Sequence, residues 1–267
     1  MMNLLLRSLY LDSQFIRLPL SPLQKVDFIV KKYLNIAKNY VWGLHIGKSH
    51  IKVLGQNYYY YDKFGIAFLE SVLIENRYLT SYIKPGAVIV DIGAHVGEFH
   101  IFCKKILRAA QIISIEPVKE SFLLLQKNIG QKPYNYAVST KKNVIMYTPD
   151  TTIMSSSFRG SICQRQEECR GIFLDNLAEI RNLKNIDVVK IDVEGAEYDV
   201  LRTTKKTLTK TKYLFIEVSI QRPSSGNLFE ILDIIKNYCP ASKIIHIGRP
   251  FSIAGKPICV DILIRCN

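Results

Sequence analysis

Hydrophobic and polar positions follow two different rhythms along the 267-residue chain. In the first third, apolar residues recur at helical spacing over 26–41 and 66–83, and a stretch rich in Ile, Val and Tyr over 43–61 is typical of a hairpin. Beyond it, β-branched runs alternate with helical patterns of about 10 to 12 residues. The change predicts an N-terminal helical and hairpin extension over residues 1–84 and a second domain over residues 85–267.

The second domain is predicted to have an α/β fold with a doubly wound, mostly parallel sheet. Strands that alternate with helices pair in parallel and are covered on both faces, which suits their β-branched, apolar character. A stretch rich in Thr, Ser and charged residues over 149–170 predicts a surface loop or lid, and 172–181 predicts a short helix. The strand-like runs are 88–91, 111–115, 134–138, 144–147, 186–192, 213–218, 243–247 and 258–264.

The stretch Asp91-Ile-Gly-Ala-His-Val-Gly97 predicts a ligand-binding turn between a buried strand and a helix. Gly93 permits a tight turn and lets a ligand approach bare backbone, and Gly97 lets the helix pack close to the strand. Open α/β sheets bind their ligands at the carboxyl ends of the strands, which is where Asp91 stands. The alternative is a glycine-rich connection with no ligand.

Four predicted strands end in an acid: Asp91, Glu116, Asp192 and Glu217. One such acid is explained as a helix cap, but four at one edge of a sheet indicate a pocket. Glu116 lies 19 positions after Gly97, where a carboxylate can accept both hydrogens of a ribose diol. Carboxylates repel the pyrophosphate of a nicotinamide dinucleotide and attract the cationic sulfonium and ammonium of S-adenosylmethionine. The charges therefore favour S-adenosylmethionine.

The string from Lys190 to Glu197, Lys-Ile-Asp-Val-Glu-Gly-Ala-Glu, is the second unusual segment. Alternation along a strand places Lys190, Asp192 and Glu194 on one side. Such charges are costly to bury unless they are paired or used in chemistry. The alternative to a functional role is a buried ion pair followed by an acidic helix N-terminus.

At these residues the chain resembles the FkbM family of methyltransferases. The resemblance covers roughly residues 64–220 and is carried by the turn motif, the string at 190–197 and three short steps, Ile115-Glu116-Pro117, Ala137-Val138-Ser139 and Phe215-Ile216-Glu217. It implies a seven-stranded, Rossmann-like, S-adenosylmethionine-dependent fold and, typically, O-methylation of a hydroxyl on a sugar or natural-product scaffold. His95 stands where the family usually has Asn, and either side chain can donate a hydrogen bond.

The resulting site hypothesis assigns each candidate a role. Asp192 and Glu194 are candidate general bases, with Lys190 and Glu217 shaping their charge. Asp192, Glu194 and Glu217 also offer oxygen ligands to a divalent ion, but no spacing demands one, and none is predicted. The residues expected at the cofactor are Gly93, Ala94 and Gly97 under the methionine moiety, His95 beside them, Asp91 toward the ammonium, Glu116 at the ribose, and Asn135 and Ala137 flanking the adenine. Acceptor specificity is expected in the N-terminal extension.

Charge leaves two further alternatives open. The net charge of +13 and pI near 9.4 suit an anionic partner, so an RNA methyltransferase is possible, although the lysines are scattered. The basic amphipathic helix over 22–41 either packs on the protein or lies on an anionic membrane, so a non-catalytic, membrane-associated scaffold is the other alternative. Six cysteines without metal-ligand spacing and no visible secretion signal predict a cytoplasmic protein. The oligomeric state stays open.

Overall fold

The protein was analysed as a computed structural model that describes residues 2–41, 49–61, 65–148, 165–220, 227–248, 250–253 and 256–267. Its helices are α1 (Met2–Phe15), α2 (Pro22–Val41), α3 (Gly65–Glu75), α4 (Glu98–Phe102), α5 (Lys119–Ile129), α6 (Ala178–Asn182), α7 (Glu197–Leu201), α8 (Lys205–Thr209) and α9 (Leu228–Tyr238). Its strands are β1 (Ser49–Val53), β2 (Gln56–Tyr60), β3 (Val88–Ile92), β4 (Gln111–Ile115), β5 (Ala137–Val138), β6 (Asn143–Thr148), β7 (Arg165–Ile172), β8 (Ile186–Ile191), β9 (Thr211–Ser219), β10 (Lys243–Ile247), β11 (Phe251–Ile253) and β12 (Lys256–Arg265).

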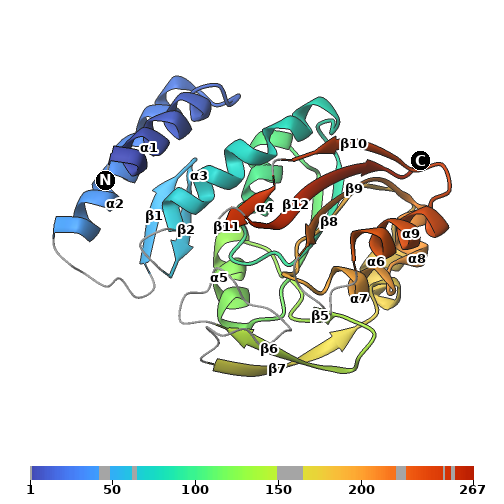
Figure 1. Ribbon diagram of the computed structural model, residues 1–267. Helices are drawn as coiled ribbons and strands as arrows, with labels where there is room; N and C mark the ends of the chain where they lie inside the picture. The colour runs from blue at the N-terminus through green and yellow to red at the C-terminus, as the bar shows by residue number, and fades with distance from the viewer. Residues whose placement is uncertain are drawn as a thin grey trace.

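The central sheet contains seven strands within the described part of the chain, but it is mixed rather than mostly parallel, so the predicted architecture is confirmed only in part. Its main path has the order β10-β12-β9-β8-β3-β4, and β11 pairs with β12 off this path (Figure 1). The pairs β3–β4, β3–β8 and β8–β9 are parallel, whereas β12 is antiparallel to each of its partners. The parallel centre brings the carboxyl ends of β3, β4, β8 and β9 to one edge.

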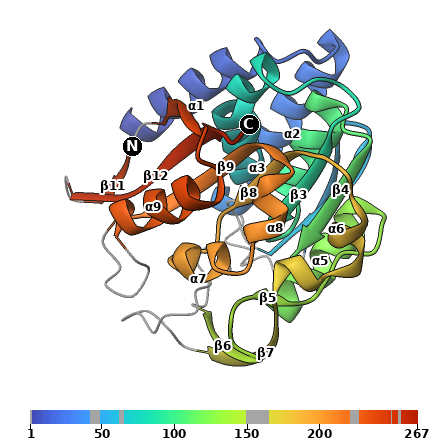
Figure 2. The same cartoon turned by 90° about the vertical axis from the view of Figure 1, so that its right-hand side faces the viewer.

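Helices cover both faces of the sheet, as the doubly wound prediction requires. Alternate residues of each central strand point to opposite faces, so Ile89 and Val188 join one hydrophobic cluster while Val90 and Val189 join the other. The first cluster also contains side chains of α1–α4, and the second contains side chains of α6–α9. Figures 1 and 2 show these two groups of helices on opposite sides of the sheet.

The N-terminal extension consists of two helices, the β1–β2 hairpin and α3, so the helices and the hairpin expected there are present. Its helices are joined by a buried ion triad. The Nζ atom of Lys32 lies 2.8 Å from a carboxylate oxygen of Asp12 on α1 and 2.8 Å from one of Glu70 on α3. Because Lys32 is only 2% exposed and Glu70 is fully buried, α3 is held against α1 and α2 by charge as well as by apolar contact.

The packing face of α2 differs from the apolar stripe read in the sequence. Phe28, Lys32 and Asn35 are buried, whereas Leu23, Val26, Val30 and Leu34 are at least half exposed, because α2 packs through a face that includes the ion triad. Membrane contact through this helix stays a prediction. Among the residues that the structure describes, no helix is both long and apolar enough to cross a bilayer.

A small separate sheet replaces part of the predicted surface loop. Strand β7 covers the end of the 149–170 stretch and lies between β5 and β6, antiparallel to β6 and parallel to β5. Residues 149–164 lie outside the described part of the chain. Polar and charged residues did not preclude a strand here, because β7 fully buries only Cys169 and pairs through its backbone. The expected helix over 172–181 is a short 3₁₀ turn followed by α6.

Candidate active site

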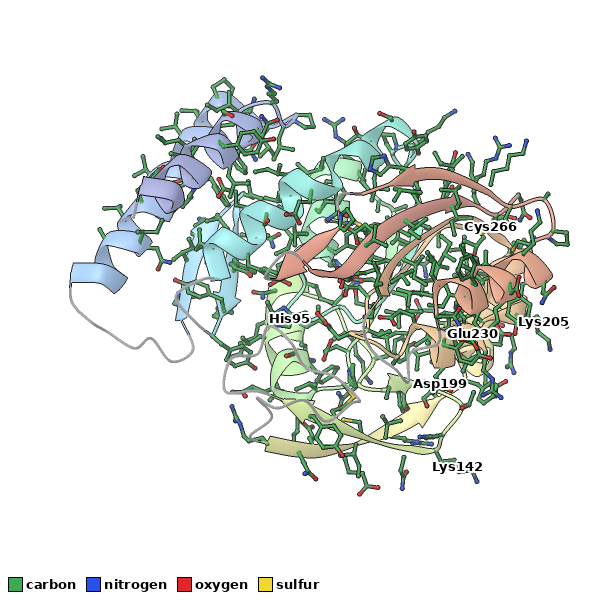
Figure 3. The ribbon with its side chains drawn as sticks, viewed as in Figure 1. His95, Lys142, Asp199, Lys205, Glu230 and Cys266 are labelled. Carbon is green, nitrogen blue, oxygen red and sulfur yellow. The ribbon has the colours of Figure 1, made fainter. Side chains whose placement is uncertain are left out.

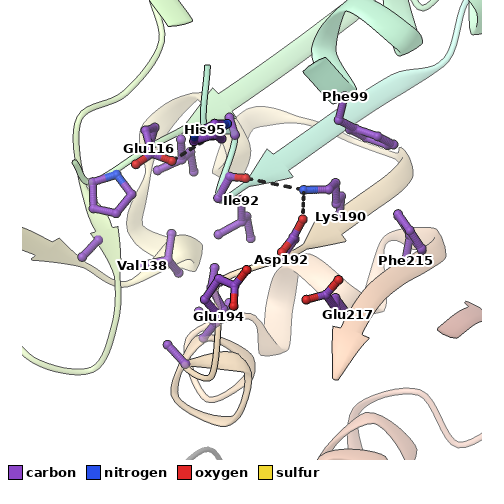
Figure 4. A pocket seen from close by; sticks show the side chains of 18 of the residues that line it. Ile92, His95, Phe99, Glu116, Val138, Lys190, Asp192, Glu194, Phe215 and Glu217 are labelled. Carbon is purple, nitrogen blue, oxygen red and sulfur yellow. Dashed lines mark hydrogen bonds and ion pairs between the residues drawn. The ribbon is translucent and has the colours of Figure 1, made fainter. Parts of the chain in front are cut away.

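A cavity of about 230 Å³ lies at the carboxyl ends of β3, β4, β8 and β9. Most of the predicted site residues line it: Gly93, Ala94, His95, Glu116, Ala137, Lys190, Asp192, Glu194 and Glu217 (Figures 3 and 4). Asp91, Gly97 and Asn135 are not among the described residues that form its wall. Most of the residues that the sequence singled out therefore lie around one cavity. That this cavity is the functional site, and which roles these residues have in it, stay predictions.

The turn after β3 is fixed by backbone hydrogen bonds and by glycine. The N–H groups of Gly93 and Ala94 donate to the carbonyl of Ile115 at 3.0 and 3.1 Å, which ties the turn to the end of β4. Gly93 has φ +78°, and a Cβ atom there would lie 1.8 Å from the carbonyl oxygen of Asp192. Only glycine fits this position, because a larger residue would overlap the end of β8, and the turn lines the cavity with Gly93 and Ala94.

Gly97 and His95 also adopt left-handed backbone conformations. A Cβ on Gly97, at φ +102°, would approach Leu125 of α5 to 3.0 Å, so Gly97 leaves room for side chains of α5. The predicted close packing of the helix that follows the turn on the strand stays a prediction. His95 has φ +49°. Asn and His are among the non-glycine residues enriched in this conformation, which explains how His95 replaces the usual Asn.

The His95 ring is held by a carboxylate. Its Nδ1 atom lies 3.3 Å from both oxygens of Glu98, and Glu98 also accepts a 2.8 Å hydrogen bond from the Tyr58 hydroxyl of β2. Burial opposes a charge on the ring, but Glu98 and Glu116 outweigh it and raise the pKa of His95 to about 9. His95 is therefore a cation at neutral pH, and the N-terminal hairpin helps to hold its partner.

Glu116 lies in the cavity wall, and its carboxylate already accepts backbone hydrogen bonds. Its two carboxylate oxygens accept hydrogen bonds from the backbone N–H groups of His95 and Val118, both at 2.9 Å. Burial raises the pKa of Glu116 to about 7. Asn135 does not contribute to the wall; its side-chain amide donates to the Glu116 carbonyl at 2.9 Å and to the Pro117 carbonyl at 2.8 Å, so it braces the turn behind Glu116.

Lys190 joins two acids beneath the turn. Its Nζ atom lies 3.0 Å from Asp192 and 3.5 Å from Asp91 (Figure 4 shows the first pair). Burial would favour the neutral amine, but Asp192 and Asp91 raise the pKa of Lys190 above its usual value. Asp91 is fully buried, and burial raises its pKa to about 6 despite the lysine. Asp91 therefore lies behind the cavity wall and pairs with Lys190, which is part of that wall.

Asp192, Glu194 and Glu217 form the cluster anticipated from the sequence. Each offers a carboxylate oxygen within 4.8 Å of the others, a separation that would suit a divalent cation. Strand alternation is not the reason, because β8 ends at Ile191 and Glu194 sits in a turn with φ +52°. Burial and the charges of Asp192 and Glu194 raise the pKa of Glu217 to about 9. Glu217 therefore carries a proton at neutral pH.

The sequence missed several residues of the wall. Phe68, Val72 and Glu75 come from α3, and Asp261 comes from β12, directly opposite Glu217 in the antiparallel pair. Asp261 could have been found by the signal that identified the other acids, a single carboxylate within an apolar strand. The α3 residues carry no such signal, because their spacing is that of an ordinary amphipathic helix.

Fold and site together define a Rossmann-like α/β protein with a glycine turn and strand-end acids. The family model described as the methyltransferase FkbM domain matches residues 91–238. The chain belongs to the FkbM methyltransferase family, which confirms the resemblance found in the sequence.

Relatives support the predicted class of enzyme, an S-adenosylmethionine-dependent O-methyltransferase. The 2-O-methyltransferase NoeI of Sinorhizobium fredii is 28% identical over 200 residues, which are 65% of this chain and 82% of NoeI. The hexuronic acid methyltransferase AglP of Haloferax volcanii is 24% identical over 147 residues, 53% of this chain and 60% of AglP. Among solved structures, M. capricolum TrmK with S-adenosyl-homocysteine has 13% identity and a TM-score of 0.43, covering 75% of this chain and 68% of that one.

Proposed function

We propose that the chain transfers a methyl group from S-adenosylmethionine to a hydroxyl oxygen of a sugar, glycan or similar small-molecule acceptor. The observation that carries the proposal is that the glycine turn after β3 and carboxylates from β4, β8 and β9 line one cavity. Family membership supports methyl transfer. The names of NoeI and AglP, a 2-O-methyltransferase and a hexuronic acid methyltransferase, support an oxygen acceptor on a sugar.

The donor set of the cavity fits S-adenosylmethionine better than a dinucleotide. Gly93 lines the cavity without a side chain, because a Cβ atom there would overlap the Asp192 carbonyl, and the wall carries several carboxylates but few cations. When bound, S-adenosylmethionine supplies an electrophilic methyl group on a cationic sulfur. We assign Glu116 to the ribose hydroxyls, Gly93 and Ala94 to the floor of the methionine end, and Ala137 to the adenine side.

Asp192 and Glu194 are the proposed general bases. The acceptor hydroxyl must lose its proton as its oxygen forms the new bond to carbon, and a carboxylate within reach can take that proton. The Asp192 side chain is 36% exposed and so is accessible from the cavity. Glu217, protonated at neutral pH, is a poor initial acceptor of that proton. Its role, with that of Lys190, is to set the charge around the base.

Labelled S-adenosylmethionine tests the proposal. The purified protein is incubated with the labelled cofactor and fractionated cell extract, and label is expected in a glycan or small-molecule fraction. Label confined to RNA, with a salt-sensitive affinity for it, would instead support the RNA alternative. Flotation with anionic liposomes in the absence of any S-adenosylmethionine binding would support the scaffold alternative, and uptake of a dinucleotide in calorimetry would exclude the assigned cofactor.

A further inference from the structure

The N-terminal extension supplies one wall of the cavity. Phe68 and Val72 of α3 line it together with Glu75 at the end of that helix. The Phe68 ring meets the His95 ring edge to face, with 5.9 Å between centroids, so α3 directly contacts the glycine turn. Acceptor contacts are thus available from a segment that precedes the matched family domain, which begins at residue 91.

This wall is held in a fixed position. Glu70 lies on α3 between Phe68 and Val72, on the buried side of the helix, where it pairs with Lys32 at 2.8 Å. The triad of Lys32, Asp12 and Glu70 therefore sets the orientation from which α3 presents its other side to the cavity. A fixed wall is what a specificity-determining surface requires.

Acidic side chains outnumber basic ones on the described wall of the cavity. Glu75 of α3 lines it together with Asp261 of β12, and Asp261 stands opposite Glu217 of β9 in the antiparallel pair. Acids from α3, β9 and β12 therefore line one cavity, even though Glu217 favours its protonated form.

The cations of the wall are already paired. Among the lining residues that the structure describes, the basic side chains are Lys190 and His95, and each lies within ion-pair distance of a carboxylate. An acidic acceptor entering here would meet further carboxylates without an uncommitted positive charge. A hydroxyl or an ammonium group, by contrast, donates hydrogen bonds that carboxylates accept.

Apolar and aromatic side chains also line the cavity. Phe68 and Val72 lie on one wall, and Phe99 and Phe215, with ring centroids 6.0 Å apart, also line the cavity. Binding sites combine such surface with a few polar groups that fix orientation, and the C–H face of a sugar ring packs well on aromatic side chains. The combination suits a polyhydroxylated ring without a negative charge.

We propose that α3, β9 and β12 form an acceptor subsite for a neutral or amine-bearing sugar and reject acidic sugars, with Glu75 as a specificity-determining residue. The inference rests on the proposed methyltransferase function and specifies its substrate class. Glu75 suits a test because it is exposed at the end of α3 and outside the proposed cofactor and base residues.

The test compares three methyl glycosides with one ring shape: glucoside, glucosaminide and glucuronide. We expect the native enzyme to methylate the neutral and amine-bearing sugars at least about tenfold more efficiently, by kcat/KM, than the acidic one. Glu75→Lys should raise the ratio of glucuronide to glucoside efficiency by about tenfold. Asp233→Lys, which reverses an exposed charge on α9 across the sheet, should leave that ratio unchanged.

Several results would overturn the inference. One is a native preference for the glucuronide, and another is an unchanged ratio in Glu75→Lys. If none of the three sugars is methylated while S-adenosylhomocysteine still binds in calorimetry, the subsite is wrong and the methyltransferase function stands. If S-adenosylhomocysteine does not bind either, the proposed function fails as well.

Discussion

The carbonyl oxygen of Asp192 lies where a side chain of residue 93 would begin: a Cβ atom on Gly93 would come within 1.8 Å of it. The N–H of Asp192 also donates to the carbonyl of Ile92 at 3.1 Å. The end of β8 and the turn after β3 are therefore locked together. This contact couples the proposed floor of the cofactor site to the proposed general base.

Replacing Gly93 with Ala should disrupt both the fold and the site. The new methyl would meet backbone rather than a flexible side chain, in addition to about 1 kcal/mol of strain from the left-handed conformation. We expect a loss of at least about 3 kcal/mol in the free energy of unfolding in urea, by analogy with other overpacked sites. S-adenosylhomocysteine binding in calorimetry should be lost with it.

Gly130→Ala is the matched control for this change. Gly130 also has a left-handed conformation, with φ +65°, but a Cβ there meets nothing within 4 Å. The Gly130→Ala variant should therefore lose only about 1 kcal/mol in its free energy of unfolding, from the left-handed backbone conformation, and should retain cofactor binding. Equal effects of the two substitutions would show that the contact with Asp192 is unimportant.

Asp192→Asn should preserve the fold and abolish methyl transfer. The amide has nearly the same shape as the carboxylate but cannot take the hydroxyl proton, and general-base removal typically costs about 10²- to 10⁴-fold in rate. Turnover is measured with the labelled cofactor, folding by thermal unfolding and cofactor binding by calorimetry. A fully active variant would remove Asp192 from the role of base. Asp233→Asn, at an exposed position of α9, controls for the loss of one negative charge.

Glu116→Ala should weaken cofactor binding selectively. Loss of hydrogen bonds from a ribose to a charged acceptor costs about 1.5 to 3 kcal/mol, which is about a 10- to 150-fold rise in the dissociation constant. The backbone N–H groups of His95 and Val118 also lose an acceptor, so unfolding must be measured in parallel. An unchanged dissociation constant for S-adenosylhomocysteine in a folded variant would exclude the ribose role.

The sequence predicted which residues would lie together because a few of them have conspicuous chemistry. Gly93 and Gly97 do occupy positions with positive φ, and the acids at the ends of β4, β8 and β9 do reach one cavity. These inferences required only that the carboxyl ends of parallel strands lie at the same edge of the sheet, which is true of β3, β4, β8 and β9. The sequence predicted a strand where β12 lies but not the direction of that strand, because an antiparallel strand can be as apolar as a parallel one.

What the sequence could not show depends on tertiary packing. Periodicity identified an apolar stripe on α2 that includes Val26, Val30 and Leu34, and left open whether it packs on the protein or on a membrane. The helix packs instead through a face with Lys32, whose two carboxylate partners lie 20 and 38 positions away, so these three side chains are at least half exposed. Glu75 was not recognised either, since an exposed acid on a helix is ordinary until the fold places it at a cavity.

Lys32→Met should destabilise the protein strongly at neutral pH. Removing the cation leaves Asp12 and Glu70 close together without it, and breaking one partner of a buried ion pair costs about 3 to 5 kcal/mol. Lys31→Met is the control, because Lys31 forms a more exposed pair with Asp27 whose loss should cost about 1 kcal/mol or less. The free energy of unfolding is measured in urea.

The defect of Lys32→Met should also shrink in acid. Burial already raises the pKa of Glu70 to about 7, above its usual value near 4.5, so its protonated form is favoured in the folded protein. Lowering the pH from 7 toward 4 protonates the Glu70 carboxylate and removes its charge. A defect that does not change over this range would show that lost packing, rather than uncompensated charge, is its cause.

His100 predicts a separate loss of stability in acid. The imidazole is 4% exposed, and its Nδ1 atom lies 3.0 Å from the Ser114 hydroxyl oxygen. Burial, with a smaller contribution from Lys104, lowers the pKa of His100 from its usual 6.5 to about 4. The folded state therefore favours the neutral ring. Its contribution is fully present above about pH 6.5 and is lost as the pH falls from 6.5 to 4, by about 3 kcal/mol in all.

Comparing the native protein with His100→Asn isolates this contribution from the many carboxylates that titrate in the same range. The free energy of unfolding in urea, measured at half-unit steps from pH 7 to 4, should show a difference between the two proteins that narrows as the pH falls. The difference narrows because only the native protein takes up a proton on the His100 ring when it unfolds. Acid therefore favours unfolding of the native protein more than unfolding of the variant. His50→Asn, at an exposed position of β1, controls for the loss of a histidine. A difference that stays constant down to pH 4 would mean that the ring is charged in the folded protein or solvated as in the unfolded chain.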